Sequence, residues 1–510
     1  MACPPASGGH KGTHLTEQAS RRRAQAPLIA ILCVAAALRL GLATQTIVYH
    51  ADEVWQYLEP AYGLVTGHWV QAWEFHDNIR GWFVPVLLAG PIALGHALAP
   101  DTPLHLTLVR MALGLAALGV PLAWYDLARP SGRGVALVAA FVGAIWCECV
   151  YFAPRTGAEG LALTVLFPAI ALAQRVRRDP GGRRTGALLG LLLAIAFLIR
   201  FQYAPAIGLI ALWALMPDWR RVWPMMIAGG IAGLCIGALC DVVTGHAPLV
   251  WMWNSFRTNL VEGRSEMFGT QPPTWLVATQ LRAWGWASVL IVPAALWGAR
   301  RRVMLLTAAL VVIALHSAIA HKEYRFILFG ATTLVMLAAI GSAEAAQALA
   351  RRRGQPAGPL LALLALVWAG ASLAAATGPF FRDLWVQGDM QFGAEIAAGE
   401  QPGACGIAAY QAHAHPLFAA SFVNRPVPLL LFDGPEAPLE AAAMRARFNV
   451  VMGSRLAGQT LPAEYRLVEC HHQEDLAPQD QDACLFVRPG PCHGPVGDFA
   501  YQPAMERRGK

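Results

Sequence analysis

The chain has 510 residues, of which 56% are hydrophobic and only 14% are charged, and its mean hydropathy is +0.44. These values exclude an ordinary soluble enzyme and are typical of a protein that crosses a membrane several times. The formal net charge of +7 does not indicate a nucleic-acid partner, because Arg and Lys form short runs between apolar segments. We therefore predict a polytopic α-helical membrane protein that binds membrane lipids and no nucleic acid.

The N-terminal 26 residues are polar and include the basic run Arg21–Arg23, after which a long apolar run begins at Pro27. This run is too long for the core of a signal peptide, and no clear small-residue cleavage site follows it. We predict that residues 1–26 are a cytoplasmic tail and that the run is a retained first span.

Apolar runs long enough to cross a bilayer recur along the chain. We predict about eleven spans, near residues 27–46, 104–126, 135–153, 158–174, 185–201, 203–217, 223–243, 275–298, 303–320, 326–349 and 359–377. With this count, the basic clusters all lie on one side, the cytoplasm: Arg21–Arg23, Arg129 with Arg133, Arg175–Arg184, Arg220–Arg221, Arg300–Arg302 and Arg351–Arg353. The apolar segment 82–98 would break this parity if it crossed, so we predict a non-spanning helix in the first outer loop.

The loop after the first span is rich in ionisable and aromatic residues. Asp52 and Glu53 are adjacent carboxylates at the expected membrane edge, and Gln56, Glu74 and Arg80 follow before the next long apolar run. Acidic groups kept at a bilayer surface usually have a function. The alternative interpretation is a solvated loop with incidental charge.

Polar residues from other parts of the chain fall on the same outer side. They are Arg155, Thr156, Glu159, Arg200, Gln202, Asp241, the loop 244–274 and the stretch His321–Phe326. Their shared side favours one active site built from several loops. Two alternatives stay open: Arg155, Glu159 and Arg200 as interhelical ion pairs, and His321–Phe326 as a charged turn that anchors two spans at the interface.

Beyond about residue 378 no apolar run has spanning length. We predict a transmembrane domain over 27–378 and a small α/β domain on the outer side over 379–510. Its expected strands are Cys405–Tyr410, Val427–Phe432, Phe448–Met452, Tyr465–Cys470 and Cys484–Val487, with a helix at Pro438–Arg447.

The C-terminal part also contains several cysteines and histidines. Cys405, Cys470, Cys484 and Cys492 would lie in a compartment that permits disulfides, with Cys470 and Cys484 a close pair, although the pairing does not follow from sequence. The histidines lack metal-ligand spacing, and we interpret them as solvated: His413, His415, His471 and His472.

Two motifs resemble those of glycosyltransferase family 22, the mannosyltransferases that use lipid-linked sugars to build N-glycan precursors and GPI anchors. His50-Ala51-Asp52-Glu53 is similar to its His-Pro-Asp-Glu opening, with Ala51 in place of Pro, and His321–Phe326 matches its His-Lys-Glu-x-Arg-Phe signature without a mismatch. Weaker matches follow in the order of that family: Gln56, Glu59-Pro60, Trp73-Glu74-Phe75, Arg80, Pro85, Arg155-Thr156, Asp241, Gly245, Asn254 and Asn259. The resemblance covers roughly residues 27–345.

This resemblance implies a GT-C type fold and an inverting transfer of a sugar, mannose in this family, from a polyprenyl (dolichyl-type) phosphate donor to a glycan or glycolipid acceptor. Asp52 is the candidate general base, and Glu53 would orient the acceptor or support Asp52. Candidate ligands of the donor phosphate are His321, Lys322 and Arg325, with Glu323 holding one of these cations. Supporting roles are assigned to His50, Gln56, Glu74, Arg80, Arg155, Glu159, Arg200 and Asp241.

No cofactor is predicted and no metal ligand is assigned, since cationic side chains can neutralise a leaving phosphate; a divalent cation stays an open alternative. The alternative function is a transporter or flippase of lipid-linked sugars, but the sequence shows no inverted repeat that would support it. A third is an inactive scaffold, against which the intact carboxylates and the complete His321–Phe326 signature argue. The richness in Ala, Arg and Gly and the absence of a retrieval signal favour a bacterial inner membrane with a periplasmic site, whereas in a eukaryote the site would face the endoplasmic reticulum lumen.

The positive-inside pattern generates a topological prediction. Cysteines introduced by Arg352→Cys and Glu436→Cys should react differently with a membrane-impermeant thiol reagent in intact cells. We expect labelling at position 436, on the outer side, and labelling at position 352 only after the membrane is permeabilised. A protected position 436 would place the C-terminal domain in the cytoplasm and overturn the assignment of sides.

Overall fold

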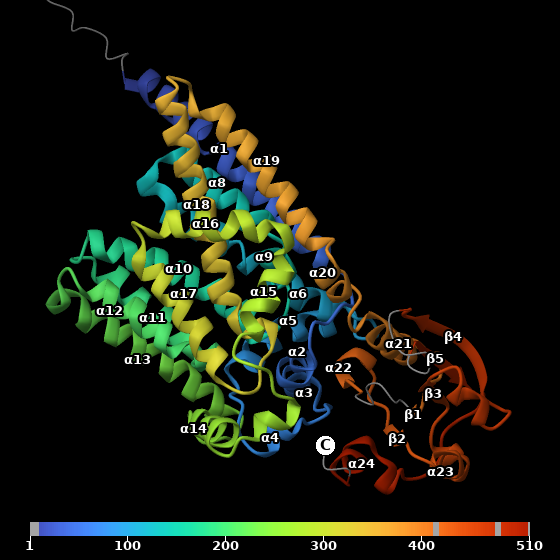
Figure 1. The fold of residues 1–510 in the computed structure, drawn as a ribbon. Helices are drawn as coiled ribbons and strands as arrows, with labels where there is room; N and C mark the ends of the chain where they lie inside the picture. Colours follow the sequence, from blue (N-terminus) through green and yellow to red (C-terminus); the bar gives the residue numbers. More distant parts are fainter. Residues whose placement is uncertain (1–9, 412–417, 475–480, 508–510) are drawn as a thin grey trace, which may run out of the picture.

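The apolar runs become helices because a bilayer offers no water to backbone polar groups, so these groups must bond within their own segment. The computed structural model describes residues 10–411, 418–474 and 481–507. A large helical part is followed by a small sheet with its own helices, which packs beside the first outer loop (Figure 1).

The first half of the helical part builds the outer loop and the helices around it. It contains α1 (His10–Ala43), α2 (Ala51–Glu53), the π-helical turn η1 (Val54–Leu58), α3 (Glu59–Thr66), α4 (Trp73–His76), α5 (Phe83–Leu98), α6 (Leu104–Ala116), α7 (Gly119–Ala128), η2 (Arg129–Ser131), α8 (Arg133–Ile145) and α9 (Cys147–Tyr151).

The second half contains the long helices of the bundle. These are α10 (Ala158–Arg178), α11 (Arg183–Ile199), η3 (Phe201–Tyr203), α12 (Ala204–Leu215), α13 (Trp219–Val243), α14 (Val250–Phe256), η4 (Arg257–Val261), η5 (Arg264–Phe268), α15 (Trp275–Trp284), η6 (Gly285–Ala287), α16 (Ser288–Ala299), α17 (Val303–Ala318), η7 (Tyr324–Ile327), α18 (Leu328–Arg352) and α19 (Ala357–Ala376).

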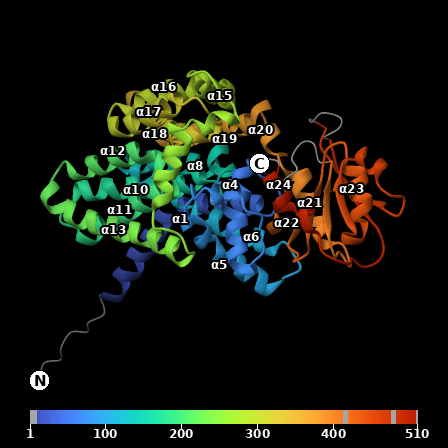
Figure 2. The ribbon, with the colours of Figure 1, turned by 90° about the horizontal axis from the view of Figure 1, so that it is seen from below.

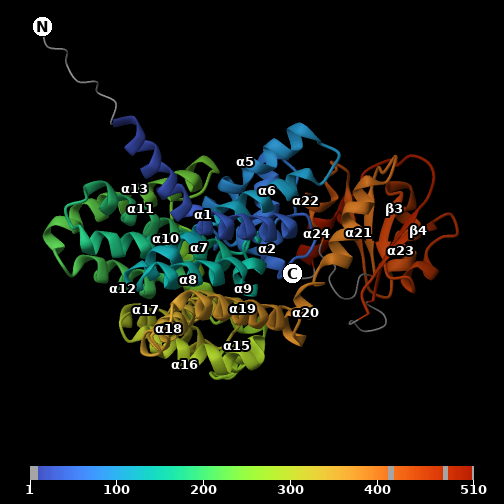
Figure 3. The ribbon, with the colours of Figure 1, turned by 90° about the horizontal axis from the view of Figure 1, so that it is seen from above.

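The helices lie in two groups that flank the N-terminal helices. Seen from above, α10 to α13 occupy one side and α15 to α19 another (Figure 3). Small residues let paired helices approach closely within each group. A Cβ added to Gly298 of α16 would lie 2.1 Å from the Leu337 carbonyl oxygen of α18, and one added to Gly229 of α13 would lie 1.8 Å from the Ala187 carbonyl oxygen of α11.

Six helical segments of the described chain are long and apolar enough to span a membrane: Gln25–Ala43, Leu104–Ser131, Ala158–Arg178, Trp219–Val243, Tyr324–Arg352 and Ala357–Ala376. Shorter apolar helices lie at Phe83–Leu98, Arg133–Ile145, Phe201–Leu215 and Val303–Ala318. The protein is thus an integral membrane protein, and the count of about eleven spans stays a prediction.

The predicted run 104–126 is divided between α6 and α7, and two other predicted runs are not continuous helices. The run 275–298 is interrupted at Gly285, whose φ of 55° lies in the left-handed region that favours glycine. The run 135–153 is interrupted after Ile145. There the buried Arg39 guanidinium caps the end of α8 by donating hydrogen bonds to the carbonyl oxygens of Gly143 and Ala144. In both places one predicted span is two shorter elements.

The C-terminal part forms the predicted α/β structure. Its five-stranded sheet has the order β2-β1-β3-β5-β4, in which β1 pairs in parallel with β2 and β3, while β5 pairs antiparallel with β3 and β4. Each of the five predicted stretches overlaps a strand, and the predicted helix overlaps α23. The elements are α20 (Pro379–Leu384), α21 (Asp389–Glu400), β1 (Ile407–Tyr410), α22 (Ala420–Val423), β2 (Leu429–Phe432), α23 (Ala437–Met444), η8 (Arg445–Arg447), β3 (Val450–Gly453), η9 (Ala457–Thr460), β4 (Arg466–His472), β5 (Asp482–Val487), η10 (Gly497–Phe499) and α24 (Tyr501–Arg507).

The cysteines and histidines of this part have defined partners. Disulfides join Cys405 to Cys492 and Cys470 to Cys484, the second being the pair expected to lie close. His471 and His472 bond to the carboxylates of Glu469 (2.8 Å) and Asp482 (2.7 Å). His413 and His415 lie outside the described residues.

A buried carboxylate of the first outer loop attaches the C-terminal part to the helical part. Glu59 accepts backbone N–H groups from Ala420 (3.1 Å), Ser421 (2.7 Å) and Val70 (2.8 Å). The neighbouring Trp55 indole donates to the Phe418 carbonyl oxygen at 3.1 Å. Burial raises the pKa of Glu59. As a result α22 lies between the sheet and the first loop, as the view from below shows (Figure 2).

This attachment predicts the effect of Glu59→Gln. The amide nitrogen of Gln cannot accept a hydrogen bond, and each buried donor that loses its acceptor costs about 1–3 kcal/mol. We expect faster tryptic cleavage after Arg382, an exposed residue of α20 in the segment that joins the two parts, and a lower unfolding temperature of the purified protein. The matched control is Glu464→Gln, which removes an exposed carboxylate. It should change neither the cleavage rate nor the unfolding temperature. Equal cleavage of both variants would contradict the assigned role of Glu59.

Candidate active site

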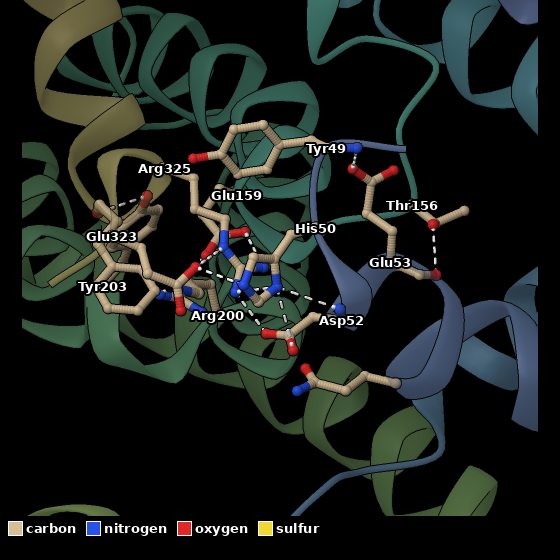
Figure 4. Close-up of polar contacts among 12 residues, drawn as sticks. Tyr49, His50, Asp52, Glu53, Thr156, Glu159, Arg200, Tyr203, Glu323 and Arg325 are labelled. Atoms are coloured by element: carbon tan, nitrogen blue, oxygen red, sulfur yellow. Dashed lines mark hydrogen bonds and ion pairs between the residues drawn. The ribbon is translucent and has the colours of Figure 1, made fainter. Parts of the chain in front are cut away.

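The guanidinium of Arg325 lies at the centre of a buried ionic cluster (Figure 4). It donates from Nε to Glu323 Oε2 at 2.7 Å and from Nη2 to Asp52 Oδ2 at 2.5 Å, and its Nη1 lies 3.7 Å from Glu159 Oε2. Arg325 is only 3% exposed. A buried charge is tolerated when opposite charges and hydrogen bonds surround it. The cluster therefore joins the first outer loop, α10 and the loop before α18 through one side chain.

Asp52 is the most exposed carboxylate of those that contact Arg325, with 22% of its side chain exposed against 17% for Glu323 and 1% for Glu159. His50 begins α2, and its Nδ1 accepts the backbone N–H of Asp52 at 3.2 Å. The same ring bridges Asp52 and Glu323, with separations of 3.4 Å to each carboxylate. Burial favours the neutral acid, but Arg325 and His50 outweigh it and hold the pKa of Asp52 well below its ordinary value. Asp52 is thus ionised at neutral pH.

Glu53 points away from Asp52 and toward the backbone of Tyr49 (Figure 4). Its Oε1 accepts the Tyr49 N–H at 3.0 Å, and its own carbonyl oxygen accepts the Thr156 hydroxyl at 2.8 Å. Burial raises the pKa of Glu53, and the nearby Arg155 opposes this rise. Glu53 consequently fixes the loop that carries Asp52. This geometry matches support of Asp52, one of the two roles expected from the sequence.

Glu159, Arg200 and Arg155 form the contacts expected of interhelical pairs, but they adjoin the same cluster. Arg200 Nη2 lies 3.0 Å from Glu159 Oε1, and Glu159 in turn faces Arg325. Arg155 donates to the Ile47 carbonyl oxygen, next to the Asp52 loop, and its guanidinium lies 4.7 Å from the centre of the Tyr151 ring. The two interpretations of these residues are therefore compatible.

Lys322 contacts an outer loop rather than the carboxylates. Its ammonium donates to the carbonyl oxygens of Gln271 (2.8 Å), Ala320 (3.4 Å) and Ile319. His321 bonds to the Gly269 carbonyl oxygen at 2.9 Å and to Glu323 at 3.0 Å, and this bond to Glu323 raises the pKa of His321. Of the three cations that the sequence assigned to the donor phosphate, the structure brings only Arg325 into contact with Asp52.

The remaining predicted residues shape the far part of the first loop. Gln56 donates to Glu74 at 2.8 Å, and burial raises the pKa of Glu74. Asp241, near the end of α13, accepts the backbone N–H groups of Trp82 (3.1 Å) and Leu249 (2.8 Å). Leu249 has a φ of 61°, a conformation that this bond helps to hold. Arg80 lies two residues before Trp82, in the turn that Asp241 fixes.

A further buried acid near the site, Glu148, was not predicted from the sequence. Glu148 in α9 is 0% exposed and accepts hydrogen bonds from Trp146 (2.7 Å), Gln280 (2.7 Å), Trp284 (3.3 Å) and the Tyr324 hydroxyl. Because Tyr324 precedes Arg325, this network positions the Arg325 backbone. An isolated acid inside the apolar run 135–153 was the signal that could have identified it.

The cluster also contains a set of metal-ligand atoms. His50, Asp52 and Glu323 each offer one such atom, all within 4.8 Å of one another. Arg325 contacts the same carboxylates and already supplies a positive charge there. The cluster therefore presents an ionised, partly exposed carboxylate that a guanidinium holds in place.

Comparisons with known proteins agree with the motifs. The sequence profile described as the Alg9-like mannosyltransferase family matches residues 30–381. The chain is 28% identical to GPI mannosyltransferase 3 of Yarrowia lipolytica over 308 residues, which cover 58% of this chain and 59% of that protein. It is 26% identical to GPI alpha-1,2-mannosyltransferase 3 of Danio rerio, with coverage of 54% and 52%. It is 25% identical to alpha-1,2-mannosyltransferase alg9 of Schizosaccharomyces pombe, with coverage of 51% and 46%. The matches thus span about half the length of these relatives.

Solved structures share the fold over nearly the whole chain. ArnT from Cupriavidus metallidurans, bound to undecaprenyl phosphate, has a TM-score of 0.57 at 14% sequence identity, and its apo state has a TM-score of 0.56 at the same identity. Each comparison covers 92% of this chain and 99% of ArnT. The likeness confirms the predicted GT-C type fold.

The ionic cluster predicts a pH-dependent stability. Burial raises the pKa of Glu323, but Arg325 and His321 outweigh it and lower that pKa to about 2; the pKa of Asp52 is also depressed. The stabilisation from these acids is complete above their unfolded pKa values of about 4 and is lost as the pH falls toward 2. We expect Arg325→Gln to reduce the loss of stability between about pH 5 and pH 2, measured by intrinsic fluorescence in detergent.

The control for this measurement is Arg257→Gln, which removes an arginine whose side chain is 64% exposed and paired with Glu262. It should leave the acid dependence of the wild type unchanged. Identical profiles for the two variants would mean that Arg325 does not set the ionisation of the cluster.

Proposed function

The chain belongs to the Alg9-like mannosyltransferase family, and we propose that it transfers mannose from a polyprenyl phosphate mannose donor to a glycan or glycolipid acceptor. The observation that carries this proposal is the contact between the two family motifs. Asp52 of the first motif and Arg325 of the second lie 2.5 Å apart. The GT-C type fold supports the same function, and a transporter of lipid-linked sugars has no comparable support.

In the proposed reaction Asp52 is the general base. An acceptor hydroxyl attacks C1 of the sugar from the face opposite the phosphate, a C1–O bond to the acceptor forms, and the C1–O bond to the phosphate breaks. The electron pair of the broken bond stays on the leaving phosphate, and the hydroxyl proton passes to Asp52. The attack from the opposite face inverts the anomeric configuration.

The neighbours of Asp52 would prepare it for this role. Arg325 keeps the carboxylate ionised and in place, while Glu323, Glu159 and His50 hold Arg325. Glu53 fixes the loop behind Asp52 through the Tyr49 N–H and Thr156. We propose that Lys322 holds the outer loop through the carbonyl oxygens of Gln271, Ile319 and Ala320 rather than contacting the donor.

The side of the membrane is part of the proposal. The positive-inside pattern assigns the Asp52 loop and the C-terminal domain to the outer side. In a bacterium this is the periplasmic side of the inner membrane, and in a eukaryote it is the lumen of the endoplasmic reticulum.

The sharpest test of this function is Asp52→Asn. The substitution preserves side-chain size but removes the group that takes the proton, so transfer should fall by about 10²- to 10⁴-fold. The assay uses purified protein, polyprenyl phosphate mannose and a panel of glycan and glycolipid acceptors, with transfer detected by mass spectrometry. Glu53→Gln should have a smaller effect on the chemical step, because Glu53 faces away from Asp52.

Monodisperse elution of each variant shows that folding survives. Near-normal turnover by Asp52→Asn would remove Asp52 from the role of base. A larger loss in Glu53→Gln than in Asp52→Asn would give the role to Glu53. Failure of the wild-type protein to transfer mannose to any acceptor, together with an unchanged lipid-linked glycan profile in cells that lack the protein, would contradict the proposed function.

A further inference from the structure

Arg80 is a cation beside the candidate active site that lacks a counter-ion. Its Nε is buried, and within residues 10–411, 418–474 and 481–507 no group forms a hydrogen bond or ion pair with this side chain. Its charge nevertheless acts on the site. After burial, Arg80 is the main influence on the pKa of Glu74, and it adds to the effects of Arg325 and His50 on Asp52.

Three other cations around Asp52 have acidic or carbonyl partners. Arg325 contacts the carboxylates of Asp52, Glu323 and Glu159. Arg200 pairs with Glu159 at 3.0 Å. Lys322, as described above, is surrounded by three carbonyl oxygens. A phosphate that approached Arg325 would meet its carboxylates at the same time, and like charges repel strongly where water is scarce.

The turn that carries Arg80 is held at several points. The Trp82 N–H donates to Asp241 at 3.1 Å, and Asn254 donates to the Asn78 carbonyl oxygen at 3.0 Å. A Cβ added to Gly81 would lie 2.4 Å from the Trp251 ring, so this position admits only glycine in the present arrangement. Two elements distant in sequence, α13 and α14, thus hold the turn and with it the backbone of Arg80.

A fixed guanidinium with an unpartnered buried nitrogen is costly, because a buried donor without an acceptor loses its hydration without compensation. An anionic ligand would remove this cost. The planar donors of arginine match the oxygens of a phosphate, and such charge-assisted bonds are stronger than neutral ones.

We infer that Arg80 binds the phosphate of the lipid-linked sugar donor, while Arg325 remains the partner of Asp52. This inference rests on the proposed function and names the residue that recognises the donor. It divides the cations of the site into two roles. Arg325 serves the base and Arg80 serves the leaving group, and no ion pair joins Arg80 to Asp52 in the part of the chain that the structure describes.

The test measures binding and needs no turnover. Full-length protein in lipid nanodiscs is titrated with decaprenyl phosphate and, separately, with decaprenol, which has the same chain without the phosphate; native mass spectrometry reports both affinities. For the wild type we expect the phosphate to strengthen binding. Arg80→Gln should weaken decaprenyl phosphate binding by about ten- to a hundredfold and leave decaprenol binding unchanged. Arg80→Lys keeps the charge but not the planar donors. Its affinity for decaprenyl phosphate should lie between those of the wild type and Arg80→Gln.

Two matched variants complete the design. Arg257→Gln removes an exposed outer-loop arginine and should bind both lipids as the wild type does. Asp52→Asn should keep decaprenyl phosphate binding, since Asp52 is the proposed base and not a ligand of the phosphate.

Each outcome decides a different point. Unchanged decaprenyl phosphate binding by Arg80→Gln would overturn the inference and leave the transferase function intact. If Arg80→Gln weakened the binding of both lipids equally, this result would also overturn the inference, because Arg80 would then act on the local fold. A wild-type protein that does not distinguish the two lipids would contradict the donor class of the proposed function itself.

Discussion

The structure around the site depends on the ionic contacts of one guanidinium. Arg325 contacts Asp52 and Glu323 together, and these acids come from loops more than 270 positions apart in the sequence. Each acid alone would be costly to bury, and the guanidinium makes the burial tolerable. The first loop, α10 and the start of α18 are therefore held together by the contacts of one side chain. The aromatic and amide donors around Glu148 hold the backbone beside Arg325 and restrict that arrangement further.

Much of this architecture could be predicted from the sequence because it follows from local rules. Apolar length identified the helices, and β-prone runs located all five strands, since both signals are read from neighbouring residues. Family motifs identified Asp52 and Arg325 as members of one site. The interruption at Gly285 could not be predicted from hydropathy, because apolar residues continue on both sides of it. The contacts of Lys322 could not be predicted either, since its ammonium bonds to backbone carbonyl oxygens, which every sequence contains and no motif marks.

The carboxylates of Asp52 and Glu53 are adjacent in sequence but differ in their exposure to solvent. Asp52 and Glu53 differ by one position, yet the short helical turn α2 directs them to opposite sides of the chain (Figure 4). The side facing Arg325 has an ionised acid, whereas the side facing Tyr49 has an acid whose pKa is raised by burial. Spacing alone could not have assigned these roles, because it does not show which of the two adjacent acids faces Arg325.

The attachment of the C-terminal domain has an evolutionary consequence. Glu59 receives only backbone N–H groups, from Val70, Ala420 and Ser421, so it recognises the path of the main chain and not the identity of the side chains. Proline is excluded at those three positions, because it lacks the N–H. The side chain of Asn424 adds a sequence requirement, since its amide donates to the carbonyl oxygens of Pro100 and Thr102. A different domain could therefore occupy this place only if it kept both the short helical turn and this asparagine.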